Sequence, residues 1–144
     1  MFNKKYKKIH FIGICGKGMS AIAIMLKDLG WKISGSDEGS YEPIKSLLAN
    51  ANISYNLDYK AENIPKDVDM IIIGKHTKLT IEDNDEVREA FENHKSKIKS
   101  FPEVLGELTK EKEKNVIIGS AGKSTCTSLL AWILEYSNLN PGYF

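Results

Sequence analysis

The chain has 144 residues, 42% of them apolar, which is enough for one well-buried domain and too few for two complete ones. Its 20 basic and 19 acidic residues give a formal net charge of +1, so no overall field favours nucleic acid or an anionic membrane surface. The basic segment KKYKK near the N-terminus precedes an apolar run too short for a secretory signal or a membrane span, and we therefore expect a cytoplasmic protein.

Apolar runs alternate with amphipathic segments along residues 1–109. Such alternation is typical of an α/β fold, and it predicts a Rossmann-like parallel sheet with flanking helices. The predicted strands cover residues 8–14, 31–37, 52–56, 69–74 and 97–100, and the predicted helices cover residues 19–30, 43–51, 84–94 and 102–109. In the helix at 84–94, Val87, Ala90 and Phe91 are expected to face the core, and the charged side chains are expected to form a solvated outer face.

The charged stretch KEKEKN then marks a linker into a second part, residues 110–144. There a strand is predicted at 115–119 and a helix at 127–136, with a glycine loop between them. Residues 69–74 and 115–119 are almost wholly apolar, as parallel strands buried on both faces are, so both are expected to be central in their sheets.

The first glycine loop, residues 13–20, carries Gly13, Gly16 and Gly18 between a strand and a helix. Glycines there let backbone amides approach a diphosphate, and the helix N-terminus adds positive potential. Asp37 ends the following strand, where a Rossmann-like unit places an acid for ribose hydroxyls. The spacing GxxGxG differs from the dinucleotide pattern GxGxxG, which disfavours a nicotinamide or flavin cofactor. In the alternative interpretation no ligand is bound: the glycines only allow tight packing between strand and helix, and Asp37 is only a turn residue.

The second glycine loop, residues 119–125, reads GSAGKST and precedes an apolar helix. This order is typical of a nucleoside-triphosphate site: Lys123 would contact the β- and γ-phosphates as the catalytic lysine, and Ser124 would bind Mg²⁺. The backbone amides from Ser120 to Thr125 would cradle the phosphates. Gly119 lies only three positions before Gly122, so the loop is of a shortened kind.

The shortened loop, the segment HFIGICGKGMSAIA and the following SGSD together resemble the UDP-N-acetylmuramate-binding members of the Mur ligase family. The resemblance covers essentially the whole chain. It implies a UDP-sugar-binding domain at residues 1–109, then the first strand, P-loop and helix of an ATP-binding domain at 110–144. It also implies a reaction: ATP with Mg²⁺ phosphorylates the muramate carboxylate, and the amine of an amino acid or peptide attacks the acyl phosphate to form an amide in peptidoglycan assembly or recycling.

The resemblance assigns site residues by position. The UDP diphosphate would lie against Gly13, Gly16, Lys17, Gly18, Met19 and Ser20, with Asp37 near the ribose or uracil. ATP would lie against Gly119, Ser120, Ala121, Gly122, Lys123, Ser124 and Thr125. The family commonly has Thr and then His or Asn where this chain has Ser120 and Ala121, so side-chain contacts at those two positions are not carried over.

Two branches of the family fit. GMS in the first loop resembles the ligases that add L-alanine, whereas GICG and the stretch AWILEYSNLNPGYF are more similar to the ligases that add a ready-made tripeptide, which we slightly favour. A non-catalytic nucleotide-binding sensor is the alternative from another class, and a nicotinamide-dependent oxidoreductase is third. His76 is interpreted as a solvated loop residue, and Cys15 and Cys126 as small buried thiols.

The second part is expected to end inside its domain, because few residues follow the second loop. Its apolar helix would then have an uncovered face that favours self-association. We also expect no catalysis by this chain alone, and no nucleic acid or membrane partner.

Overall fold

The structure is a computed structural model that describes residues 8–143, so most of the basic segment KKYKK lies outside the described residues. The chain divides into two compact units, Met1–Lys110 and Glu111–Phe144. The division falls beside the boundary expected after residue 109. Each unit is described by itself below.

The first unit is built on a five-stranded sheet with the order β3-β2-β1-β4-β5, in which every pair of neighbours is parallel. This confirms the predicted Rossmann-like sheet, including the short last strand. The strands are β1 (Lys8–Ile12), β2 (Lys32–Ser36), β3 (Tyr55–Asn56), β4 (Met70–Ile73) and β5 (Ile98–Ser100).

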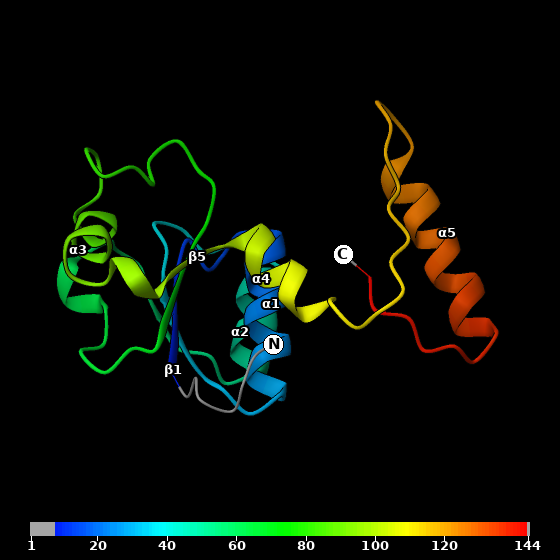
Figure 1. The fold of residues 1–144 in the computed structure, drawn as a ribbon, viewed down its shortest axis with the longest axis horizontal. Coiled ribbons are helices and arrows are strands. Elements are labelled where there is room, and N and C mark those ends of the chain that lie inside the picture. Colours follow the sequence, from blue (N-terminus) through cyan, green and yellow to red (C-terminus); the bar gives the residue numbers. More distant parts are fainter. Residues whose placement is uncertain (1–7, 144) are drawn as a thin grey trace. The chain divides into compact units, whose positions relative to one another are not determined.

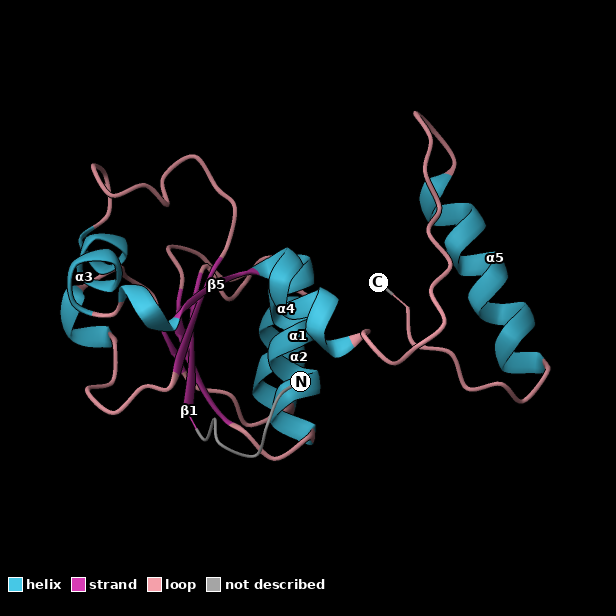
Figure 2. Cartoon of the chain, in the orientation of Figure 1, coloured by secondary structure: helices cyan, strands magenta, loops and turns pink. Residues whose placement is uncertain are grey.

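Helices cover both faces of the sheet (Figures 1 and 2). One face is covered by α1 (Lys17–Asp28), α2 (Ile44–Asn50) and α4 (Phe101–Leu108). The other carries α3 (Asp85–Asn93) and the 3-10 turn η1 (Ala61–Asn63), and a second 3-10 turn, η2 (Lys95–Lys97), precedes β5. Two separate apolar cores result, one on each side of the sheet.

The larger core lies between the sheet and α1, α2 and α4. Phe11, Ile22, Leu26 and Leu48 are completely buried there. Val104 is buried in the same core, and Leu105 and Leu108 pack against it. The smaller core under α3 is formed by Ile12, Ile64, Val68, Ile71, Val87 and Ala90.

Helix α3 differs from the prediction at two positions. Phe91 was expected to face inward, but its side chain is 37% exposed. Glu86, which the charged sequence suggested was solvated, is instead completely buried. The inward face of α3 is therefore Glu86, Val87 and Ala90. A carboxyl group can be buried there because polar partners beneath the helix bond it, and Oε1 of Glu86 lies 2.6 Å from Nε2 of His10.

The prediction of a strand at 115–119, in the second unit, is wrong. Residues 113–119 form no strand, and Val116 and Ile118 are 80% and 86% exposed. An isolated extended segment is not a strand until a neighbour pairs with its backbone groups, and none of the described residues does so here. The predicted helix is present as α5 (Lys123–Tyr136).

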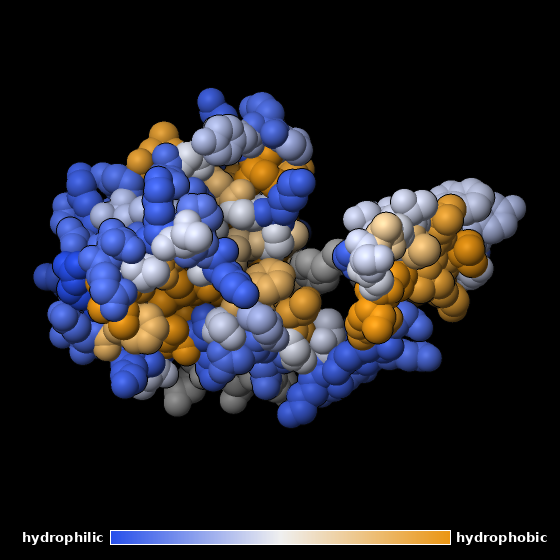
Figure 3. Space-filling view, turned by 90° about the horizontal axis from the view of Figure 1, so that it is seen from above, coloured by the Kyte–Doolittle hydropathy of each residue, from blue (hydrophilic) through white to orange (hydrophobic). Residues whose placement is uncertain are grey.

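Apolar side chains remain exposed over the second unit (Figure 3). Along α5 the exposed fractions are 55% for Leu129, 66% for Trp132 and 53% for Ile133, whereas Ala131 is buried. This confirms that apolar surface follows the second loop. Within residues 8–143 no helix has both the length and the apolar character needed to cross a membrane.

Candidate functional site

The first glycine loop lies at the carboxyl end of β1, next to the carboxyl ends of β2 and β4. Strand order reverses at β1, since β2 pairs on one side of it and β4 on the other. In open α/β sheets ligands bind outside the carboxyl ends of strands at such a reversal. The fold therefore places the loop where a ligand is expected.

Three successive amides of this loop are held by two successive residues at the end of β2. The amides of Gly13 and Ile14 both donate to the carbonyl oxygen of Ser36, at 2.9 and 3.0 Å. The amide of Cys15 donates to Oδ2 of Asp37 at 2.8 Å. Gly13 has φ +85°, a conformation that favours glycine, and this turn brings the loop back toward β2.

Gly16 and Lys17 are the exposed part of the loop. Gly16 is the N-cap of α1 and has no side chain to bond the first-turn amides. Those amides, together with the helix dipole, form a ready-made anion site. Gly16 and Lys17 are thus well placed for the diphosphate contact that the resemblance assigns to them.

Gly18, Met19 and Ser20 make contacts within the first unit. Met19 is part of the larger core, and Ser20 is buried with its hydroxyl donating to the carbonyl of Lys17 at 3.0 Å. Gly18 lies against the ring of Phe101. The structure gives these three residues the role of seating the first turn of α1, and their assignment to the ligand stays a prediction.

Asp37 is half-buried and faces the loop. Its carboxylate accepts from the amides of Cys15 and, at 3.3 Å, Gly39, while its own amide donates to the carbonyl of Asn56 on β3 at 3.0 Å. Burial and then the Asp37 charge raise the pKa of the nearby Tyr59 hydroxyl above its ordinary value. Asp37 therefore shapes the loop, and further lone pairs of its carboxylate could accept from a ribose hydroxyl.

The loops after β2 and β4 meet at the same edge. Lys78 Nζ lies 2.7 Å from Glu38 Oε2, and this pairing lowers the pKa of Glu38. Leu79 lies against Gly13, where an added β-carbon would be 3.0 Å from it. His76 is exposed, and its Nδ1 accepts from the amide of Lys78 at 3.4 Å, consistent with a solvated loop histidine.

The two cysteines differ from the prediction of buried thiols. Cys126 is exposed at the start of α5, and Cys15 is only partly buried. Burial, followed by the charge of Asp37, raises the pKa of the Cys15 thiol to about 11. Both are free thiols.

The second glycine loop turns into α5 at Gly122, whose φ of +77° favours glycine. Lys123 folds back on the loop, with Nζ 2.7 Å from the carbonyl of Gly119 and 3.4 Å from that of Ser120. Ser124 is exposed on the first turn of the helix. A lysine ammonium, first-turn amides and a serine hydroxyl in this order fit a nucleotide phosphate and its Mg²⁺, with the phosphate replacing the carbonyls as the partner of Lys123.

Several residues at the first site were not identified from the sequence. They are Ser36, Tyr59, Lys78 and Glu86. Ser36 acts through its carbonyl, which no residue type reveals, and Lys78 reaches the site from a loop of ordinary composition. For Glu86 no local signal of burial existed, because the N-cap Asn84 sets where α3 begins and not which side chains face inward.

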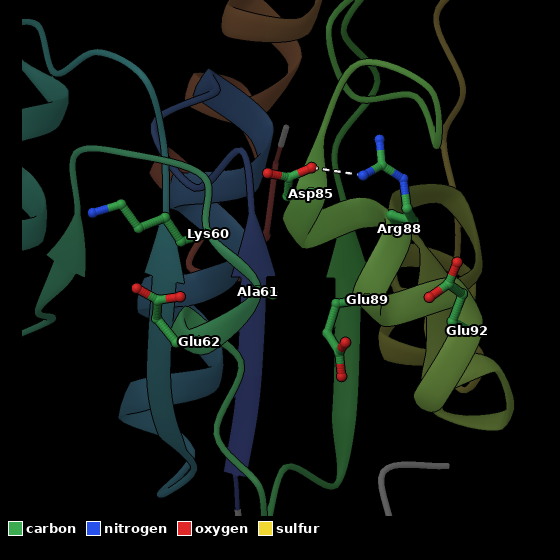
Figure 4. A pocket seen from close by; sticks show the side chains of 7 residues that line it. All are labelled: Lys60, Ala61, Glu62, Asp85, Arg88, Glu89 and Glu92. Carbon is green, nitrogen blue, oxygen red and sulfur yellow. Dashed lines mark hydrogen bonds and ion pairs between the residues drawn. The ribbon is translucent and has the colours of Figure 1, made fainter.

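A surface pocket lies between η1 and α3 (Figure 4). Asp85 and Arg88 pair across its rim at 2.7 Å. None of its lining residues belongs to either glycine loop; they are Lys60, Ala61, Glu62, Asp85, Arg88, Glu89 and Glu92. Among the described residues no group of three or more His, Cys, Asp or Glu side chains is arranged to hold a metal ion.

Comparison with known proteins decides the family. Residues 8–113 match the family model described as "Mur ligase family, catalytic domain". The chain belongs to the Mur ligase family. The matched residues include the sheet, the first glycine loop and the helices on both faces of the sheet. They contain the whole described part of the first unit.

Curated Mur ligases are similar over nearly the whole chain. The UDP-N-acetylmuramate--L-alanine ligase of Brachyspira hyodysenteriae is 40% identical over 141 residues, which is 98% of this chain and 29% of that protein. The ligase of the same name from Pelobacter propionicus is 42% identical over 138 residues, 95% of this chain and 28% of that protein. The chain thus spans less than a third of the length of these relatives.

Solved Mur ligase structures have the same fold. The UDP-N-acetylmuramate:L-alanyl-gamma-D-glutamyl-meso-diaminopimelate ligase from Neisseria meningitides has a TM-score of 0.80 at 32% identity, over 95% of this chain and 42% of that one. The UDP-N-acetylmuramate-alanine ligase from Thermotoga maritima has a TM-score of 0.75 at 27% identity, over 91% of this chain and 30% of that one. Both branches considered from the sequence are represented among the similar proteins.

Proposed function

We propose that this chain supplies the UDP-N-acetylmuramate site and the ATP loop of an ATP-dependent Mur ligase that joins the muramate carboxylate to an amino acid or peptide. The observation that carries the proposal is the first glycine loop, whose three successive amides are hydrogen-bonded to the end of β2. This leaves the exposed N-terminus of α1 open for a diphosphate. Relatives that match nearly all of the chain are named for UDP-N-acetylmuramate.

The first unit would bind and orient the sugar nucleotide. Gly16 and the amides at the start of α1 would contact the diphosphate, and the Lys17 ammonium would add charge at the same exposed turn. Asp37 would accept a hydrogen bond from the ribose or uracil. Fixing the nucleotide at one end orients the muramate carboxylate for reaction at the other.

The second unit would hold ATP. Lys123 would exchange its bonds to the carbonyls of Gly119 and Ser120 for the β- and γ-phosphates, and Ser124 would bind Mg²⁺. Bound ATP would supply the phosphoryl group that activates the muramate carboxylate for attack by the amine. An amide bond between the muramate and the amino acid or peptide would result.

Binding measurements test the proposal on this chain. Isothermal titration calorimetry with UDP-N-acetylmuramate, UDP and NADH should give heat of binding for the first two and none for NADH. A fluorescent ATP analogue with Mg²⁺ should bind, and binding should weaken in Lys123→Ala. Tight NADH binding without UDP-N-acetylmuramate binding would overturn the proposal.

A further inference from the structure

Glu86 is buried in a position where an apolar side chain would be expected. Its exposed fraction is 0%, and its helix neighbours Val87 and Ala90 belong to the smaller apolar core. Burying a carboxyl group is costly unless hydrogen bonds compensate for lost water, and a well-packed apolar residue is often at least as stabilising. The presence of a carboxyl group here therefore calls for a role other than core stability.

The partners of Glu86 come from three elements. Oε1 lies 2.6 Å from Nε2 of His10 on β1 and accepts from the hydroxyl of Ser36 on β2 at 2.8 Å. Oε2 accepts from the amide group of Asn63 in η1 at 3.3 Å. His10 in turn contacts the hydroxyl of Ser34 at 2.8 Å through Nδ1. His10, Ser36 and Glu86 are all fully buried, so the centre of this network is closed to solvent, while Asn63 and Ser34 at its ends are partly exposed.

Ser36 links the network to the first glycine loop. Its hydroxyl is bonded to Glu86, and its carbonyl is bonded to the amides of Gly13 and Ile14. Asp37, which follows it directly, holds the amide of Cys15. A shift of Ser36 would therefore displace all three loop amides and the carboxylate together.

We propose that Glu86 is a positioning residue of the sugar-nucleotide site, which acts through Ser36 to fix the first glycine loop and Asp37 in the conformation that binds a nucleoside diphosphate. The inference rests on the proposed UDP-N-acetylmuramate site. Glu86 itself touches no ligand, because it lies on the side of the sheet covered by α3 and is sealed from solvent. Its effect on binding is transmitted through one hydroxyl.

The test compares Ser36→Ala with Val87→Ala in the 144-residue chain. Ser36→Ala removes the link but leaves Glu86 its contact with His10, whereas Val87→Ala removes methyl groups from the same core without touching the network. Calorimetry with UDP-N-acetylmuramate should give a Kd raised by up to about tenfold for Ser36→Ala, because the energy of one hydrogen bond that orders the loop sets the upper limit of the affinity that its loss can remove. Val87→Ala should lose thermal stability yet keep the wild-type Kd.

Two further measurements separate positioning from stability. Amide hydrogen exchange of Gly13 and Ile14 should accelerate in Ser36→Ala and stay unchanged in Val87→Ala. Glu86→Gln, which keeps an oxygen acceptor for Ser36, should retain most of the affinity. A wild-type Kd with unchanged exchange in Ser36→Ala would overturn the inference, as would equal loss of affinity in both alanine variants. Failure of the wild-type chain to bind the nucleotide would instead overturn the proposed function.

Discussion

Phe101 packs so closely on Gly18 that a β-carbon at position 18 would lie 2.8 Å from Cζ of its ring. Phe101 begins α4, and Gly18 is in the first turn of α1, so this contact joins two helices beneath the glycine loop. Gly18→Ala should therefore destabilise the fold by about 1–3 kcal/mol through overpacking. Chemical denaturation measures the loss.

The matching variant is Phe101→Leu, which makes room for the added methyl group. If the contact is the cause, Gly18→Ala should cost clearly less in the Phe101→Leu background than in the wild type, and a double-mutant cycle would report the coupling. Equal costs in the two backgrounds would show that Gly18 is required for another reason.

Gly16 can accept a side chain without strain from the protein. Its φ and ψ of −61° and 142° suit any residue, and an added β-carbon would meet Gly13 and Met19 only at ordinary contact distance, 3.5 Å. Gly16→Val should thus leave the fold intact but obstruct the amides that a diphosphate approaches. We expect the Kd for UDP-N-acetylmuramate to rise at least tenfold, about 1.4 kcal/mol.

Gly106→Val serves as the control, because a β-carbon at Gly106 in α4 meets nothing within 4 Å. Calorimetry on both variants should give weakened binding for Gly16→Val and wild-type binding for Gly106→Val. Equal affinity of Gly16→Val and the wild type would remove the first loop from the nucleotide site.

The two thiols should react at different rates. The pKa of Cys15 is raised to about 11 by burial and then by the Asp37 charge, so at pH 8 only about a thousandth of it is the reactive thiolate. Cys126 is exposed and should be alkylated first by iodoacetamide. In Cys126→Ser the remaining reaction should be slow and should accelerate as pH rises toward 11.

The variant Asp37→Asn tests whether the Asp37 charge raises the pKa of Cys15. Removing the carboxylate charge removes an influence that raises the pKa of Cys15, so the pKa should fall and the reaction at a given pH should become faster. Mass spectrometry of the Cys126→Ser background follows the single thiol. An unchanged or slower rate would contradict the assigned effect of Asp37.

The exposed face of α5 should drive self-association. Leu129, Trp132 and Ile133 each expose more than half of their side-chain surface, and uncovered apolar patches favour contact between molecules. Light scattering should give a larger mean mass for the whole chain than for a chain ending at Thr109. Trp132→Gln should reduce association in the whole chain, and identical masses for all three would argue against this surface.

We expect no ligase and no sustained ATPase activity from the 144-residue chain by itself. The second loop offers Mg²⁺ one serine hydroxyl, and the described residues contain no cluster of three or more His, Cys, Asp or Glu side chains that could hold a metal ion. When the reacting groups are not oriented and the charge of the transition state is not stabilised, the activation free energy can rise by on the order of 10 kcal/mol. The assay mixes chain, ATP, Mg²⁺ and UDP-N-acetylmuramate with L-alanine or the tripeptide, and measures phosphate and amide product. Product that disappears in Lys123→Ala would contradict this expectation.

Much of the fold was predictable because its signals are local. Five apolar runs separated by amphipathic segments indicate parallel strands joined by helices, and all five strands of the first unit form. The strand predicted at 115–119 did not form, because a strand depends on a neighbour whose presence no local pattern reveals. The inward side of α3 was misjudged at Glu86 and Phe91, since periodicity counts a carboxylate as solvated whatever lies beneath it.

The sequence predicted where the first glycine loop and Asp37 lie in the fold, whereas their contact with a ligand stays a prediction. Glycines between a strand and a helix indicate an anion loop, and Asp37 was expected at the neighbouring strand end. That its carboxylate accepts from the amide of Cys15 was not predictable, because backbone donors and acceptors have no residue signature. For the same reason the sequence does not reveal the bonds of the Ser36 carbonyl to the loop amides or the bond of the Ser36 hydroxyl to Glu86.

The hydrogen bonds that hold the amides of Gly13, Ile14 and Cys15 to the end of β2 affect how a nucleotide would bind. A free glycine-rich segment samples many conformations. A ligand that binds only one of them has a lower affinity, because binding must then order the segment. Here the conformational entropy of the loop is lost during folding, before any nucleotide arrives. Association should consequently resemble the docking of rigid bodies, with little loop rearrangement and a rate set mainly by diffusion and orientation.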